Sequence, residues 1–256
     1  MRNSLIVGAV VLVALAILIA LGTWQVQRLA WKSALIERLQ SRVHQAPAAL
    51  GATIDRFLNN EDVEYQPVRL RGKFLHDTEK HLYTIDKKGR SGWHIYTLME
   101  LSGGDCAACQ GRNRYIYVNR GFVPYELKAK DRRRGGLVPG QVELTGLVRL
   151  TRTGKNFAEV DNQPRKNEWF WLSLKEMSGP ESGLTTRQAA HLVPFFVDQR
   201  VSPQKGQWPR AGTTRVDLDN RHLGYVITWY GLALALLGVY GFFLYGNRRQ
   251  TNKGET

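Results

Sequence analysis

Two uninterrupted apolar runs stand out in the hydrophobic pattern, one near each end of the chain. Leu5–Leu21, LIVGAVVLVALAILIAL, contains no charged residue, and Tyr225–Tyr245, YVITWYGLALALLGVYGFFLY, carries aromatic residues toward both ends. A transmembrane helix needs about 20 predominantly apolar residues, and aromatic rings concentrate at membrane interfaces. The pattern therefore predicts two membrane-spanning helices, over residues 5–24 and 225–245.

The first apolar run also has the charge pattern of a cleavable signal peptide, because Arg2 precedes it. Its apolar length exceeds that of a usual signal sequence, however, and the stretch LIALGTWQ offers no cleavage site with small residues at the required spacing. The sequence therefore favours an uncleaved membrane anchor.

Apolar residues continue at helical spacing beyond the first run. Leu29, Ile36, Leu39 and Val43 follow this period, so the helix is expected to continue to about residue 45, before Pro47 interrupts it. A further helix is expected within 183–191, GLTTRQAAH.

Beyond residue 60 the pattern changes to short stretches rich in β-branched and aromatic residues, separated by Gly, Asn, Asp and Pro. These stretches are EYQPVRLRGKF, HLYTID, WHIYTLMEL, RYIYVNRGFV, QVELTGLVRL, EWFWLSL and LVPFFVDQRV. The predicted fold class is an α+β membrane protein in which two transmembrane helices flank one β-rich, antiparallel, barrel- or sandwich-like extracytoplasmic domain. The predicted divisions are an anchor (1–28), a helical connector (29–60), the β-rich domain (61–218), and the second helix with a short cytoplasmic tail (219–256).

The chain is strongly basic, with a formal net charge of +14 and a pI near 10.0. The cluster KAKDRRR would suit nucleic-acid phosphates, but Gly and Pro follow it between strands, which favours a solvated loop or attraction to anionic lipid. No nucleic-acid partner is expected. Because long loops translocate largely regardless of charge, we place the central domain outside the cytoplasm and the tail NRRQTNK inside.

Two cysteines, Cys106 and Cys109, lie in GGDCAACQGRNR with the spacing of a redox pair or half a metal site. Gln110 follows Cys109 where covalent haem attachment needs His, and there is no second cysteine pair for a four-thiolate zinc site. A local disulfide in an exposed loop is favoured over a functional thiol or copper site with His94.

No hydrolase, zinc-protease or phosphate-binding motif is present, so we do not expect an enzyme. Glu79 and His81 are two residues apart in a strand pattern, which places them on one face without any catalytic role. In VNRGFVP, Gly121 is expected to permit a backbone geometry or close approach that a side chain would block, and Arg120 to be a buried or interfacial charge partner. Both are taken as structural residues.

His222 stands directly before the second apolar run. A neutral imidazole is an axial ligand for haem iron, and a membrane interface lets a macrocycle lie in lipid while its carboxylates stay in water. Arg221 or Arg215 would pair with those carboxylates, because guanidinium matches carboxylate bidentately. Tyr225 and Trp229 lie on the His222 side of the helix and would support the macrocycle.

The second apolar run also carries a stripe of small residues. Gly224, Gly231 and Gly238 repeat every seven residues. Small residues let membrane helices approach closely, so this stripe is expected to pack on the first span and turn His222 away from it.

Several of these stretches together resemble the Surfeit-locus (Shy-type) family of cytochrome c oxidase assembly factors. They are GTWQVQRLAWKSALI, YQPVRLRGKFLHDTE, VNRGFVP, GLVR and NRHLGYVITWYGLA, in the family's order and across essentially the whole chain. The resemblance implies a protein of the bacterial or mitochondrial inner membrane, with the central domain on the periplasmic or intermembrane side, that assists haem a delivery to or insertion into oxidase subunit I.

The resemblance also implies haem a as a transiently bound cofactor, with His222 as its ligand, and oxidase subunit I, the haem a synthesis machinery and membrane lipid as partners. The chain departs from the family at Arg221, where a polar amide or acid is usual, and at Gly224, where Gln is usual. CAAC looks like an addition to a loop. Two alternatives stay open: a scaffold that stabilises subunit I without haem, and a thiol or copper chaperone using Cys106 and Cys109.

Overall fold

The computed structural model describes residues 2–102, 115–151, 156–157, 159–202, 206–214 and 220–253. The chain divides into two compact units. One combines Met1–Leu39 with Val216–Thr256 and is called the helix pair below, and the other, Gln40–Arg215, is called the sheet unit. The predicted connector, residues 29–60, is shared between the two.

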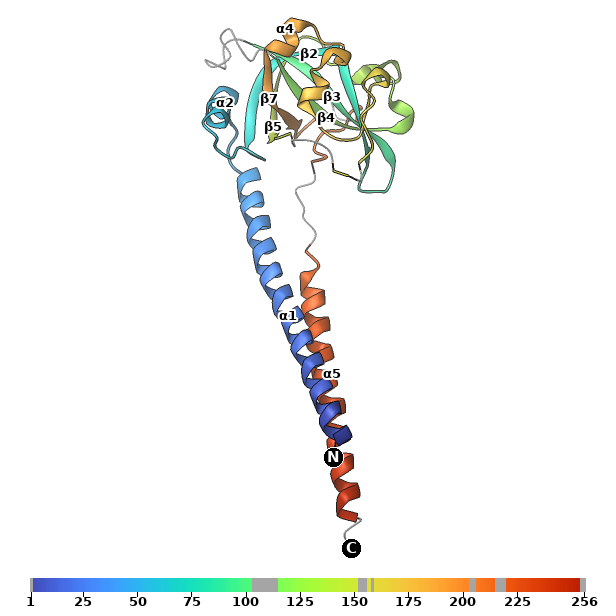
Figure 1. The fold of residues 1–256 in the computed structure, drawn as a ribbon. Helices are drawn as coiled ribbons and strands as arrows, with labels where there is room; N and C mark the ends of the chain where they lie inside the picture. The colour runs from blue at the N-terminus through green and yellow to red at the C-terminus, as the bar shows by residue number, and fades with distance from the viewer. Residues whose placement is uncertain are drawn as a thin grey trace. The chain divides into compact units, whose positions relative to one another are not determined.

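The helix pair contains α1 (Arg2–Val43) and α5 (His222–Lys253), drawn blue and red in Figure 1. Within the described part of the chain, these are the two helices long and apolar enough to cross a membrane. Side-chain hydrogen bonds join the two segments at Thr23–Tyr230, Gln25–His222 and Ser33–Asn220. The first helix ends at Val43, two residues before the predicted residue 45. Pro47, which cannot continue a helix, follows it.

The sheet unit begins with β1 (Ala48–Ala49) and the amphipathic helix α2 (Leu50–Leu58). Leu50 and Ile54, one helical turn apart, are 2% and 0% exposed and pack in the same hydrophobic cluster as Val68 and Phe195. Residues 48–58 are therefore part of the globular core.

Five long strands form the sheet, visible around the centre of the globular part in Figure 1. They are β2 (Pro67–Ile85), β3 (Ser91–Leu101), β4 (Tyr115–Pro124), β5 (Gln141–Arg149) and β7 (Leu192–Gln199). The ladders run β2–β3–β4–β7–β5, and β5 also pairs with β2, so the pairings form a closed circuit. The fold class is therefore as predicted, with two apolar helices flanking one β-rich unit.

The expectation of an antiparallel sheet holds for the β2–β3, β3–β4, β2–β5 and β5–β7 ladders, but β4 and β7 pair in parallel. Parallel neighbours need a long crossover, and the chain between these two strands supplies one that includes β5 and the short helices. The short strands β1 and β6 (Glu168–Trp169) are also parallel to β2.

Three predicted strands differ from the structure. The stretches EYQPVRLRGKF and HLYTID form the single strand β2, whose pairing with β3 shifts register between Leu75 and Lys80. EWFWLSL pairs only over β6 and then enters α3 (Leu174–Met177), because Asn162 accepts the backbone N–H groups of Phe170 and Trp171 in place of a neighbouring strand. The helix expected within 183–191 is present as α4 (Thr186–Ala190), with a capping box from Thr185 and Gln188.

Candidate functional site

His222 is the first residue of α5, and α1 holds it from one side. Its Nδ1 lies 2.8 Å from Oε1 of Gln25, whose side chain belongs to a residue only 8% exposed. A carbonyl oxygen accepts from an N–H, so the contact places the imidazole proton on Nδ1 and leaves the lone pair on Nε2. Nε2 makes no hydrogen bond with any described residue. The arrangement presents one ring nitrogen in a defined tautomer.

The small-residue stripe does not pack on α1, which corrects the sequence-based expectation. A Cβ added at Gly224, Gly231 or Gly238 would meet nothing within 4 Å. The close approaches instead occur at glycines of α1, where an added Cβ would lie 2.9 Å from Tyr240 Oη at Gly8 and 2.9 Å from the Tyr230 ring at Gly22. Large rings on α5 fill gaps left by small residues on α1, so His222 faces α1 instead of turning away.

The residues proposed to act with His222 differ in solvent exposure. Tyr225 is 54% exposed, whereas Trp229 is half-buried and its buried Nε1 has no hydrogen-bond partner among the described residues. Arg221 is exposed. Arg215 and the pair Cys106 and Cys109 fall outside the described residues, so their roles stay predictions.

Gln25 is a member of this site that the sequence reasoning missed. The signal was a glutamine in the motif GTWQVQRLAWKSALI, immediately after the first apolar run. A polar amide just after an apolar run needs a partner when it is buried, and here that partner is 197 residues away in the sequence.

The pair Glu79 and His81 belongs to a buried charge cluster. The Glu79 carboxylate, on a side chain 5% exposed, accepts hydrogen bonds from both terminal nitrogens of Arg133 and lies 3.7 Å from Arg120 Nη1. Burial alone would raise the pKa of Glu79, but the His81 and Arg133 contacts and the charges of Arg133 and Arg120 lower it to about 2. This ion cluster accounts for the pair without catalysis.

The basic segment KAKDRRR is only partly the solvated loop that its composition predicts. Its last five residues lie in the 3₁₀ segment η3 (Lys130–Gly136), which is kinked at Arg133, and Arg133 is 4% exposed. Its guanidinium also donates to the backbone oxygens of Leu127 and Lys128. Arg133 is buried because Glu79 and these carbonyls replace its water.

Arg120 and Gly121 lie in the middle of β4, where its pairing with β3 shifts register. Arg120 is 3% exposed, stacks 4.7 Å over the Phe74 ring, and donates to the Gly136 carbonyl oxygen. Burial lowers the Arg120 pKa to about 10. Gly121 has φ of +114°, and an added Cβ would lie 1.9 Å from the Arg210 carbonyl oxygen. Both reasons that the sequence suggested for a glycine, special backbone geometry and close approach, apply here.

The fold and this site define a class of protein: a membrane-associated chain with a closed-circuit sheet unit between two apolar helices and a positioned imidazole at the start of the second helix. The SURF1 family model matches residues 12–234. The chain is 36% identical to Surfeit locus protein 1 of Homo sapiens over 223 residues, covering 84% of this chain and 70% of the human protein.

Two further relatives show the same breadth of similarity. Surfeit locus protein 1 of Mus musculus is 36% identical over 231 residues, covering 84% of this chain and 68% of the mouse protein. A SURF1-like protein of Monosiga brevicollis is 31% identical over 225 residues, covering 87% and 81%. The chain belongs to the SURF1 family.

Proposed function

We propose that this chain is a membrane-bound assembly factor for haem-copper cytochrome c oxidase that assists haem a delivery to, or insertion into, subunit I. Membership of the SURF1 family and the two apolar helices support the general role. The observation that carries the haem assignment is the Gln25–His222 hydrogen bond. The proposed role is non-catalytic, with oxidase subunit I and the haem a synthesis machinery as partners.

Nε2 of His222 would hold the haem iron. Gln25 Oε1 accepts the Nδ1 proton, which fixes the imidazole tautomer and the ring orientation and keeps Nε2 available. When bound, the iron supplies a strong bond to that nitrogen. A single iron ligand on a half-buried side chain would bind haem a reversibly, and a carrier must be able to release its cargo.

Surrounding residues have proposed supporting roles. The exposed ring of Tyr225 and the half-buried indole of Trp229 would contact the macrocycle, and Arg221 or Arg215 would pair with its carboxylates. Because Arg221 is exposed, its ion pair would contribute only about 1 kcal/mol or less. Loss of the iron ligand should therefore have the larger effect.

The test uses the full chain made in cells that synthesise haem a. His222→Ala is expected to abolish copurified haem a, measured by its absorption spectrum per folded protein, while Arg221→Ala only weakens it. His44→Ala is the matched control, since His44 is exposed and its Nδ1 also contacts an oxygen, that of Gln40. Full haem a content with an unchanged spectrum in His222→Ala would overturn the ligand assignment.

The same preparations separate the alternatives. A wild-type chain that binds subunit I yet carries no haem a supports the haem-independent scaffold. Loss of oxidase assembly in Cys106→Ser with Cys109→Ser, but not in His222→Ala, supports the thiol or copper chaperone.

We also propose a two-pass topology in the inner membrane, with the sheet unit on the periplasmic or intermembrane side. Arg165, whose side chain is 86% exposed, is a suitable reporter position. In a Cys106→Ser, Cys109→Ser background, Arg165→Cys should react with an impermeant maleimide added from the periplasmic side of bacterial cells. Labelling only after the inner membrane is permeabilised would reverse the orientation.

A further inference from the structure

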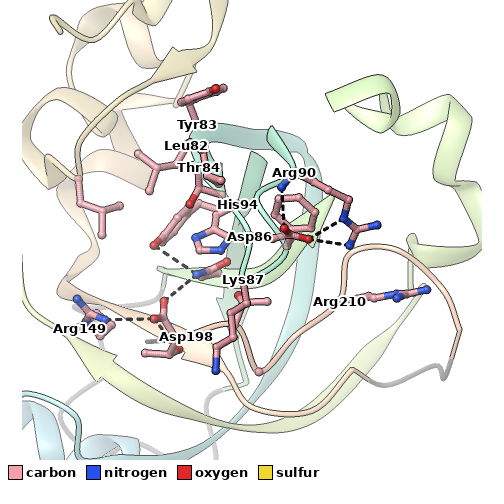
Figure 2. A pocket seen from close by; sticks show the side chains of 18 of the residues that line it. Leu82, Tyr83, Thr84, Asp86, Lys87, Arg90, His94, Arg149, Asp198 and Arg210 are labelled. Atoms are coloured by element: carbon pink, nitrogen blue, oxygen red, sulfur yellow. Dashed lines mark hydrogen bonds and ion pairs between the residues drawn. The ribbon is translucent and has the colours of Figure 1, made fainter. Parts of the chain in front are cut away.

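The sheet unit contains a cavity of about 810 Å³, within the size range of small-molecule sites. It is lined by the tip of the β2–β3 hairpin, by the C-terminal ends of β4, β5 and β7, and by the segment 208–214 (Figure 2). In Figure 2, His94 lies between the Arg149–Asp198 pair and the Asp86–Arg90 pair. The cavity has no part in the function proposed above.

The floor of the cavity holds a carboxylate whose charge is already satisfied. Asp198, 4% exposed, accepts from Asn119 Nδ2 at 3.0 Å and from Thr214 Oγ1 at 2.8 Å, and its Oδ2 lies 3.7 Å from Arg149 Nη1. A cationic ligand would therefore have to displace an existing partner. Asp198 is therefore not a binding group for a cationic ligand.

One hydrogen-bond donor on the floor is unused. The buried Tyr96 hydroxyl accepts from Asn119 Nδ2 at 3.4 Å, and its own proton is donated to no described residue. Burial and the Asp198 charge raise the pKa of Tyr96 well above its usual value, so the phenol keeps this proton. A ligand that carries an acceptor oxygen would satisfy it.

Positive charge predominates around the mouth. Five basic side chains line the cavity, at 87, 88, 90, 149 and 210, against two carboxylates. The carboxylates are engaged, since Asp86 pairs with Arg90 at 2.7 Å and Asp198 pairs with Arg149. Lys88 and Arg210 form no ion pair with any described residue, so they can bind an anion without breaking an ion pair.

Part of the cavity wall is aromatic. Phe122 lies edge-on to Trp208, with ring centroids 6.2 Å apart, and edge-on to His94 at 6.5 Å. The Arg210 guanidinium lies 4.1 Å from the Trp208 ring centroid, which holds that charge at the edge of the aromatic wall. Tyr65 and Tyr83 also line the cavity. An aromatic ligand can stack on one of these rings and meet another edge to face, which are the two arrangements that aromatic pairs favour.

We infer that this cavity is a binding site for a small planar aromatic anion, whose carboxylate or phosphate pairs with Arg210 and Lys88. Its ring system lies against Phe122 and Trp208, and an acceptor oxygen of the ligand accepts a hydrogen bond from the Tyr96 hydroxyl. Charge at the mouth selects for an anion, and the aromatic walls select for a planar body over an aliphatic chain.

The test is ligand-observed ¹⁹F NMR of 6-fluoro-2-naphthoate with the full chain in lipid nanodiscs, with empty nanodiscs subtracted. Saturable binding is expected, and the neutral 6-fluoro-2-naphthamide should bind about tenfold or more weakly, because it lacks the charge-assisted contacts. Octanoate, an aliphatic anion of the lipid class, should compete poorly.

Two variants locate the probe. Arg210→Gln combined with Lys88→Gln should weaken naphthoate binding by about tenfold. Tyr96→Phe should weaken it by several-fold, since it removes one hydrogen bond and keeps the ring. Arg165→Gln, which removes an exposed charge elsewhere on the unit, should leave binding unchanged. Circular dichroism establishes that each variant is folded.

Three results would overturn the inference: equal affinity for the naphthamide, tighter binding of octanoate than of naphthoate, or wild-type affinity in the folded Arg210→Gln, Lys88→Gln variant. Octanoate preference would identify an aliphatic lipid-like anion as the ligand instead.

Discussion

The sheet unit and the helix pair treat their buried polar groups differently. In the sheet unit, Glu79 is surrounded by two guanidinium groups and Asp198 has three partners, so each buried carboxylate is saturated by the fold. In the helix pair, Gln25 holds only one nitrogen of His222. A saturated group stabilises the structure and has little left for a ligand, whereas a group held from one side is both positioned and available.

The largest effect is expected from breaking the saturated cluster. Glu79→Gln leaves Arg120 and Arg133 buried without a carboxylate, which should lower the free energy of unfolding by about 3–5 kcal/mol. The measurement is urea unfolding of the full chain in detergent, followed by near-ultraviolet circular dichroism. Glu143→Gln is the matched control: it removes an exposed partner 3.8 Å from Arg69 and should cost under about 1 kcal/mol. Equal losses would show that the buried cluster is no more important than a surface pair.

The Glu79 carboxylate should also make the free energy of unfolding decrease at acidic pH. Its folded pKa of about 2 is below the ordinary value of 4.5, so Glu79 stabilises the fold above pH 4.5 and loses that contribution as the pH falls toward 2. The shift corresponds to about 3 kcal/mol. Unfolding free energies measured across this range should show the decline in wild type and a shallower one in Glu79→Gln. Parallel curves would assign acid sensitivity to other groups.

A smaller loss is expected from backbone crowding in the sheet unit. Gly121→Ala adds a Cβ against the Arg210 carbonyl at a positive φ, which should cost roughly 2–3 kcal/mol. Gly140→Ala has a positive φ of +74° but open space around it, and should cost about 1 kcal/mol. The difference in unfolding free energy between the two variants measures the cost of the steric contact with the Arg210 carbonyl. If the two variants lost equal stability, the positive φ alone would explain why residue 121 is glycine.

The smallest effect is expected in the helix pair, and in ligand binding instead of stability. Gln25→Leu frees the His222 ring without removing Nε2, so haem a affinity should fall by about tenfold while the chain stays folded. Gln27→Leu, an exposed glutamine two residues along α1, should have no effect. Haem a titration of the apoprotein in detergent measures both. Unchanged affinity in Gln25→Leu would show that the hydrogen bond does not position the imidazole.

Local patterns were sufficient wherever a segment's structure depends on its own neighbours. The apolar run before residue 24 determines a helix by composition, and the helix continues to Val43 because apolar residues recur at its period. The strands around Ile95 and Val118 follow from alternating and β-branched residues. The position of His222 directly before the second apolar run is also a local feature, so the sequence alone indicates this candidate ligand.

Contacts between distant segments were decided only by the tertiary structure. The sequence could not show that Arg133 of a basic loop pairs with Glu79, 54 residues earlier, or that Asp198 and Asn119 meet in the floor of a cavity. The sequence-based prediction of the helix packing was also wrong. The periodic glycines on α5 predicted a close interface there, but Tyr230 and Tyr240 of α5 pack against glycines of α1 instead. Periodicity states which residues share a face. Which face is covered depends on the shape of the partner, and that is a property of two segments together.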